Sequence, residues 1–175
     1  AQAGVRFLLA ALPNAAWQRV FAASLFLGAA WSATAQPPQP PLDLIRLPPG
    51  FRIELYASVP NARSLALGDK GTLVVGSRAG SAVHAVASDG QVSKLADGLR
   101  VPNGVAFRDG ALYIAEVSRI LKIDHAESGS SAKPEVVYDK LPRETHHGWK
   151  FIRFGPDGRL YVPIGAPCNS CDRDG

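Results

Sequence analysis

Two adjacent histidines, His146 and His147, stand directly before an apolar stretch near the C-terminal end of the sequence. That stretch leads to a Gly-Pro-Asp-Gly turn at 155–158 and then to a second apolar run at 160–164. An imidazole titrates near neutral pH, so a neutral histidine at a strand entry suits removal of a proton from a substrate hydroxyl. A surface pair without a chemical role is the alternative that the composition leaves open.

The remaining histidines and the two cysteines offer less chemistry. We interpret His84, in an alternating strand pattern, and His125, in a polar turn, as structural or solvated. Cys168 and Cys171 form a C-x-x-C pair, but c-type haem would need a histidine where Asp172 stands, and structural zinc would need a second ligand pair. In an oxidising compartment, a local disulfide between the two cysteines is the plainest prediction.

A strand-turn-strand phrase occurs three times and indicates a repeat architecture. Its turn glycines are Gly71, Gly110 and Gly158, which lie 39 and 48 residues apart. Each glycine tolerates the positive φ of a tight hairpin turn. Periods of about 40–50 residues with several short strands are typical of propeller blades. The sequence therefore predicts an all-β fold, a β-propeller of which about three blades are present; an antiparallel sandwich is the alternative.

Three further stretches complete the predicted elements. Residues 51–56 alternate apolar and polar side chains and predict a half-buried strand, while 82–86 and 119–123 predict outer strands of two blades. Propellers usually close with four to eight blades. We therefore expect this chain to be the N-terminal part of a longer propeller, and to be inactive and poorly soluble on its own because a sheet edge would be exposed.

The N-terminal fifth is expected to direct export. Residues 1–35 read as a leader with a secretory signal peptide, because an apolar run at 20–31 precedes small residues in an A-x-A arrangement. That run is shorter than the roughly 20 residues that span a bilayer; an uncleaved anchor or a buried helix is the alternative. Residues 36–43 form a proline-rich spacer and 44–175 the propeller domain. We expect a periplasmic or secreted protein without a stable membrane span after cleavage.

The charge pattern indicates no polyanionic partner. The net charge is +4, and Arg6 and Arg19 of the leader contribute half of it. No cluster of lysines and arginines remains in the domain, so neither nucleic acid nor an anionic membrane surface is predicted as a partner.

Residues 147–165 resemble the glucose/sorbosone dehydrogenase family, a group of secreted six-bladed propellers that use pyrroloquinoline quinone. The stretches 47–53 and 102–107 also resemble the sorbosone dehydrogenase branch of that family. The resemblance covers about 44–175 and implies oxidation of a sugar or sugar aldehyde, with pyrroloquinoline quinone and Ca²⁺ as cofactors and a separate electron acceptor. It does not indicate which sugar or which acceptor.

The resemblance also implies roles for individual residues. His147 lies eight positions before the glycine of Gly-Pro-Asp, where the family has its general base, and would take the hydroxyl proton as hydride passes to the quinone. His146 would orient His147 or line the cofactor pocket. Asn103 falls beside a quinone-contacting position of the family. The calcium ligands are not assigned in this sequence.

Two other function classes stay open at this stage. One is a calcium-dependent lactonase of the gluconolactonase type, in which Asn103 would be a metal ligand. The other is a non-catalytic propeller that serves as a binding platform, because propellers host many functions. Replacing His147 with alanine separates the three classes. Dehydrogenation should be lost, lactonase activity should survive, and ligand binding by a non-catalytic platform should be unchanged.

Overall fold

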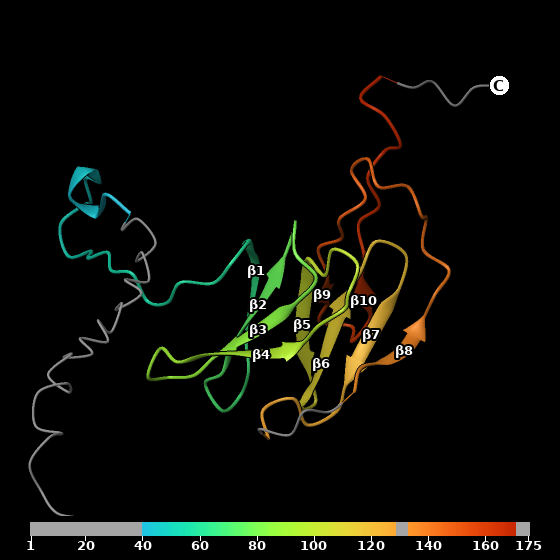
Figure 1. The fold of residues 1–175 in the computed structure, drawn as a ribbon, viewed down its shortest axis with the longest axis horizontal. Coiled ribbons are helices and arrows are strands. Elements are labelled where there is room, and N and C mark those ends of the chain that lie inside the picture. The colour runs from blue at the N-terminus through green and yellow to red at the C-terminus, as the bar shows by residue number, and fades with distance from the viewer. Residues whose placement is uncertain (1–39, 129–132, 171–175) are drawn as a thin grey trace, which may run out of the picture. The chain divides into compact units, whose positions relative to one another are not determined.

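The computed structural model describes residues 40–128 and 133–170, and nearly all regular structure in them is β-strand. The strands form three antiparallel sheets in which each strand pairs with its neighbours in sequence (Figure 1). One sheet has the order β1-β2-β3-β4, the next β5-β6-β7-β8, and the last pairs β9 with β10. The elements are η1 Leu42–Leu44, β1 Ala62–Leu67, β2 Leu73–Ser77, β3 Val83–Val86, β4 Val92–Ala96, β5 Gly104–Arg108, β6 Ala111–Ala115, β7 Ile120–Ile123, β8 Glu135–Tyr138, β9 Arg153–Phe154 and β10 Leu160–Tyr161.

These sheets are successive blades of a partial β-propeller. The first strand of each blade is innermost: β1 packs against β5, and β5 packs against β9. Two blades have all four strands, and the third shows its first two within the described residues. The prediction of an all-β partial propeller is confirmed, and the outer strands expected at 82–86 and 119–123 are β3 and β7.

The three repeated turns join the two inner strands of each blade. Asp109 and Gly110 both have positive φ, 51° and 73°, and connect Arg108 directly to its partner Ala111. This is the two-residue hairpin whose twist matches its strands. The turns at 68–72 and 155–159 are longer and share one hydrogen-bond pattern, closed by Gly71 and Gly158 at φ 86° and 78°. The repeat seen in the sequence is therefore a repeat of local geometry.

Side chains alternate between the two faces of the second blade, so this blade packs on both sides. On one face, Val105, Leu112 and Ile114 join Val74 and Val83 of the first blade in a buried core. On the other face, a second core contains Ala106, Ala115, Ile120 and Ile152, with Tyr113, Leu141, Phe154, Leu160 and Val162 packed against it. Alternation along β5 and β6 thus places each blade against its neighbours.

One predicted strand is wrong. Residues 51–56 have no strand partner among the described residues, and Phe51 and Leu55 are 72% and 47% exposed. An alternating pattern becomes a strand only where a neighbouring backbone accepts and donates its hydrogen bonds. A hydrogen bond from the Tyr56 hydroxyl to the Ala87 carbonyl (3.1 Å) connects this segment with the turn after β3.

The leader predicted at 1–35 lies outside the described residues, as does the first half of the 36–43 spacer, so both remain predictions. In the part of the chain that is described, no helix has the length and apolar character needed to cross a membrane.

Candidate active site

His147 lies on the loop that leads from β8 into β9. Its backbone adopts the left-handed conformation, with φ 51°. The next residue must be glycine, because a Cβ on Gly148 would lie 2.2 Å from the Glu144 carbonyl oxygen. The Gly148 N–H donates to the Thr145 carbonyl at 3.0 Å, which closes the turn. The left-handed histidine and the crowded glycine together turn the chain so that the His147 side chain reaches the loop after β10.

The His147 ring is held through one of its two nitrogens. Nδ1 lies 3.1 Å from the carbonyl oxygen of Ala166. A carbonyl oxygen only accepts hydrogen bonds, so in the neutral ring the proton sits on Nδ1 and the lone pair is on Nε2. The contact is close because Gly165 leaves room for it: a Cβ there would lie 2.4 Å from the His147 carbonyl oxygen.

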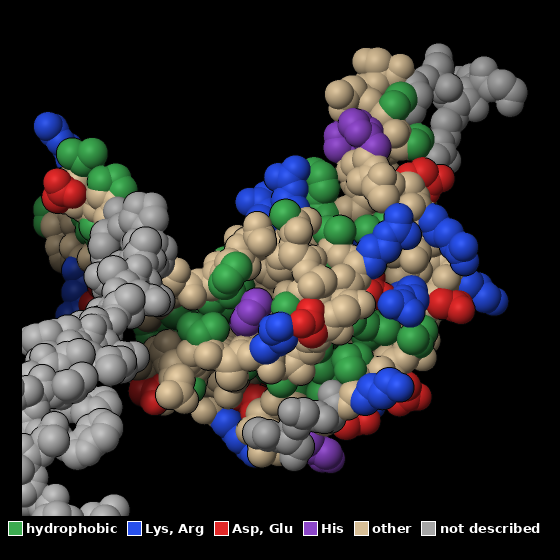
Figure 2. Space-filling model, viewed as in Figure 1, with side chains coloured by type: hydrophobic (Ala, Val, Ile, Leu, Met, Phe, Trp, Pro, Cys, Tyr) green, Lys and Arg blue, Asp and Glu red, His purple; other side chains and the backbone are tan. Residues whose placement is uncertain are grey.

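His146 and His147 are brought together. Their ring centroids are 4.1 Å apart, at an angle of 43°. His146 is exposed and His147 is half-buried. Histidine side chains are visible on the face drawn in Figure 2, where they are purple. Both rings border a small cavity of about 90 Å³. Its lining residues are Pro142, Glu144, His146, His147, Gly148, Lys150, Ile164, Gly165 and Pro167.

Lys150 is a buried ammonium at this cavity, and the sequence alone did not single it out. The residue is 1% exposed, and its Nζ donates to the Gly148 carbonyl oxygen at 2.6 Å. Burial lowers the pKa of Lys150, and the nearby negative charge of Glu144 opposes that shift. A lysine between Trp149 and Phe151 in an otherwise apolar run was the available sequence signal, because such a lysine has little room to reach solvent.

Asn103 lies next to this loop but does not line the cavity. It is 2% exposed, and its Nδ2 donates to the Lys150 carbonyl oxygen at 2.8 Å. Its Oδ1 is buried with no hydrogen-bond partner among the described residues. Gly104 makes the approach possible, since a Cβ there would be 2.7 Å from the same carbonyl oxygen. In this part of the chain, Asn103 joins the start of the second blade to the histidine loop.

An arginine from the first blade completes the cluster. The Arg78 guanidinium carbon lies 4.2 Å from the centre of a Trp149 ring, in cation–π geometry. Trp149 in turn meets the His147 ring edge-on, with centroids 6.1 Å apart. Trp149 therefore contacts both Arg78 of the first blade and His147 of the loop before the third blade.

The other two histidines lie elsewhere. His84 is half-buried in β3, and His125 is exposed in the turn after β7, with φ 52°. Neither of them lines the His147 cavity. Cys168 is disulfide-bonded, whereas Cys171 lies outside the described residues, so the pairing of these two cysteines remains a prediction.

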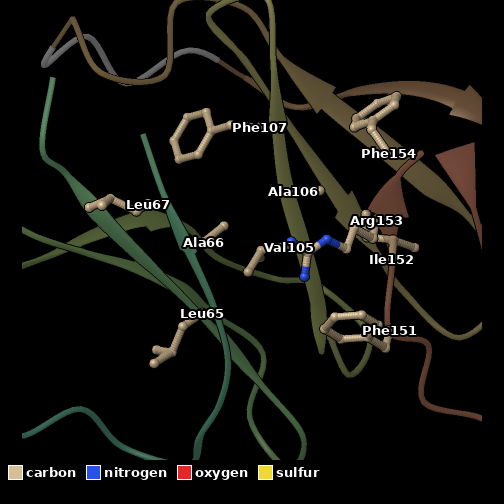
Figure 3. Close-up of a pocket in the computed structure, with 10 residues that line it drawn as sticks. All are labelled: Leu65, Ala66, Leu67, Val105, Ala106, Phe107, Phe151, Ile152, Arg153 and Phe154. Atoms are coloured by element: carbon tan, nitrogen blue, oxygen red, sulfur yellow. The ribbon is translucent and has the colours of Figure 1, made fainter. Parts of the chain in front are cut away.

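A larger cavity of about 300 Å³ lies between the innermost strands β1, β5 and β9 (Figure 3). Its walls are mostly apolar, and the Arg153 side chain extends from β9 toward Val105 (Figure 3). Arg153 makes no ion pair with any described residue. The cavity is lined by Leu65, Ala66, Leu67, Val105, Ala106, Phe107, Phe151, Ile152, Arg153 and Phe154.

The described residues fit the expected cofactors unequally. A flat quinone suits an edge built from the two neighbouring rings of His146 and His147, on which an aromatic group can stack. The His147 cavity of about 90 Å³ is smaller than the roughly 300–1,000 Å³ of a typical small-molecule site, so it would hold only part of such a group. Within 40–128 and 133–170, no group of three His, Cys, Asp or Glu residues could hold a metal ion.

Comparisons with known proteins support the fold. No family model matches the sequence, and no curated protein matches it either. An oxidoreductase (glucose dehydrogenase) from Thermus thermophilus is 22% identical, with a TM-score of 0.54 over 66% of this chain and 41% of that one. The PQQ-bound aldose sugar dehydrogenase of Streptomyces coelicolor is 25% identical, with a TM-score of 0.46 over 60% of this chain and 38% of that one.

Virginiamycin B lyase from Staphylococcus aureus is 16% identical, with a TM-score of 0.43 over 63% of this chain and 45% of that one. Of these three proteins, the one from Thermus is the most similar in structure, and at its level of identity the likeness establishes the propeller fold alone. This chain spans about two-fifths of the length of that protein.

Proposed function

We propose that the full-length protein is a quinone-dependent dehydrogenase that oxidises a sugar or sugar aldehyde, with His147 as the general base. The proposal includes pyrroloquinoline quinone and Ca²⁺ as cofactors, a separate electron acceptor, and a periplasmic or secreted location. The sequence resemblance motivates these parts. One protein of similar fold is assigned as an oxidoreductase (glucose dehydrogenase), which supports the coarser statement of an oxidoreductase.

The observation that carries the proposal is the hydrogen bond between His147 Nδ1 and the Ala166 carbonyl. This bond keeps the neutral ring in the tautomer whose Nε2 can accept a proton. A carbonyl partner also holds the ring orientation, much as the third group of a catalytic triad orients its histidine. His147 would take the hydroxyl proton of the substrate on Nε2 while the C–O bond becomes a carbonyl, giving a lactone or an acid. The quinone, when bound, supplies a two-electron acceptor for the hydride.

The test replaces His147 in the full-length gene product, reconstituted with pyrroloquinoline quinone and Ca²⁺. His147→Asn is the appropriate change, because asparagine tolerates the left-handed backbone of this position. Reduction of an artificial dye is followed with a panel of aldoses and sugar aldehydes. We expect kcat to fall by about 10²–10⁴-fold, the usual contribution of a positioned general base.

His125→Asn is the matched control. His125 has the same backbone conformation, with φ 52°, and lies outside the His147 cluster, so its replacement should leave turnover unchanged. If no quinone binds and no sugar is oxidised, the dehydrogenase proposal is wrong. Lactone hydrolysis that survives in His147→Asn would instead indicate the lactonase, and neither activity would indicate a binding platform.

A further inference from the structure

Arg78 is a cation without an ion-pair partner among the described residues, and it stacks on the same Trp149 that the candidate base meets edge-on. The residue is exposed, its guanidinium stacks on Trp149 at 4.2 Å, and it makes no side-chain hydrogen bond or ion pair with a described residue. A stacked guanidinium keeps its N–H groups free along its rim, because stacking uses only the flat face. These donors match the geometry of a carboxylate, which a guanidinium binds with two parallel hydrogen bonds.

The backbone around Arg78 is fixed before any ligand arrives. Ser77 N–H donates to the Pro102 carbonyl at 2.9 Å, which attaches the end of β2 to the chain before β5. Gly80 N–H donates to the Ser77 hydroxyl at 2.8 Å, which closes the loop on the other side of Arg78. A ligand that binds Arg78 therefore loses little free energy to ordering of this loop.

The charges around His147 leave Arg78 without a counter-ion. Among the described residues, Glu144 is the one acidic residue that lines the His147 cavity. Its negative charge partly offsets the lowering of the Lys150 pKa by burial. In the same part of the chain, no carboxylate lies within ion-pair distance of Arg78. An anionic group of a ligand would supply the missing partner.

We propose that Arg78 binds a carboxylate of the substrate, so that the preferred substrate class is an acidic sugar, such as a uronic acid, over a neutral one. The inference rests on the proposed function, because it takes His147 as the group that meets the reacting hydroxyl. One aromatic ring, Trp149, separates the guanidinium from the imidazole. A uronic acid carries its carboxylate on C5 and its anomeric hydroxyl on C1, the two carbons that flank the ring oxygen, so the proposal has one sugar ring present its carboxylate to Arg78 and its hydroxyl to His147.

The test measures binding, without turnover, to the full-length gene product by isothermal titration calorimetry. D-Glucuronate and D-glucose are the probes, and the variants are Arg78→Gln, Arg78→Lys and the control Arg63→Gln, an exposed arginine on β1. We expect wild type and the control to bind glucuronate at least about tenfold more tightly than glucose, as one hydrogen-bonded charge pair allows. Arg78→Gln should abolish this preference, and Arg78→Lys should restore part of it, because lysine cannot bind in the two-pronged manner.

Several results would overturn the inference. One is a glucuronate preference that survives in Arg78→Gln; another is a wild-type protein with no such preference. A third arm titrates pyrroloquinoline quinone in the absence of sugar. If Arg78→Gln weakens quinone binding and leaves glucuronate binding unchanged, the carboxylate belongs to the cofactor and the substrate assignment is wrong. Thermal unfolding of each variant separates a lost contact from a lost fold.

The two proposals fail separately. Glucuronate affinity does not require turnover, so a loss of Arg78 dependence leaves the result for His147 intact. Conversely, Arg78-dependent glucuronate binding without any sugar oxidation would contradict the proposed dehydrogenase and keep the acidic-ligand site.

Discussion

The side chains around His147 differ in how they are stabilised, and Lys150 is the most unusual of them. The residue is 1% exposed, and among the described residues its Nζ makes one hydrogen bond, to the Gly148 carbonyl. A buried charge with few partners loses solvation that its contacts only partly replace. The position of Lys150 behind the histidine loop therefore makes local stability depend on pH.

Lys150→Met should remove that dependence. Burial lowers the pKa of Lys150 in the folded state below its ordinary value of 10.5, so the folded protein binds fewer protons than the unfolded chain between those two pKa values. Relative to the variant, the free energy of unfolding of wild type should therefore rise with pH between these two pKa values. At pH values below both of them, it should be constant and at its lowest. Urea unfolding of the full-length protein at pH 7, 8.5 and 10 measures the difference.

Lys140→Met, at an exposed lysine, is the control, and its unfolding free energy should follow wild type at all three pH values. Parallel curves for wild type and Lys150→Met would contradict the assigned effect of burial.

At the residue scale, the sequence predicted the histidine pair but not its supports. Two adjacent histidines stand out in the sequence, because the chain has only four histidines. The partners of His147 are the Ala166 carbonyl and the aromatic edge of Trp149, which only the folded loops bring close. Asn103 was predicted as a site residue because of its place in the family resemblance. Its hydrogen bond to the Lys150 carbonyl depends instead on packing between blades.

Neighbouring blades are also joined by side chains that bind the hairpin turn of an adjacent blade. Glu127, after β7, accepts hydrogen bonds from the backbone N–H of Lys70 (3.1 Å) and of Thr72 (3.2 Å) in the turn between β1 and β2. A Cβ on Gly68 would lie 2.3 Å from the Glu127 carboxyl group, so the turn and the carboxylate are in close contact. Arg108 does the same for the third blade, where its guanidinium donates to the Gly158 carbonyl.

Glu127→Ala should lower the free energy of unfolding by about 1–2 kcal/mol, because hydrogen bonds to a charged acceptor are lost at a partly exposed site. Glu127→Gln retains one acceptor oxygen and should lose less. Chemical denaturation of the full-length protein measures both variants.

Glu54→Ala provides the comparison. Among the described residues Glu54 makes only an exposed pair with Arg52 at 3.6 Å, so the change should alter stability by less than about 0.5 kcal/mol. Equal effects at Glu127 and Glu54 would show that the turn contact contributes nothing.

At the element scale, the sequence predicted most of the strands because each blade repeats a local signal. The hairpin glycines and the alternating apolar residues depend on neighbours along the chain, so they are readable without the fold. The strand expected at 51–56 fails because a strand also needs a partner, and the pattern does not reveal whether a partner exists. The contact between Glu127 and the turn joins residues more than 50 positions apart and leaves no local signal.

At the scale of the whole molecule, the first blade has one face packed and one face open. Leu65 and Leu67 of β1 are 60% and 67% exposed among the described residues, although Val74 and Val83 of the same blade are fully buried against the second blade. In a closed propeller, each blade has a neighbour on both faces. The open face of β1 is therefore the surface that a further blade would cover.

The double change Leu65→Thr with Leu67→Thr should have opposite effects in two contexts. In the 175-residue chain expressed alone, it should reduce self-association, because exposed apolar strand faces promote aggregation. In the full-length protein, it should lower the free energy of unfolding by about 2–4 kcal/mol, if a further blade buries both side chains. Sedimentation velocity measures the first effect and chemical denaturation the second.

The matched control is Val136→Thr with Tyr138→Thr on β8, the outermost strand of the second blade, where both side chains are about half exposed. An outermost strand faces solvent in a closed propeller too, so this pair should change full-length stability by much less than the β1 pair. Equal losses from the two pairs, or a 175-residue chain that stays monomeric with wild-type Leu65 and Leu67, would contradict the view that β1 presents a blade interface.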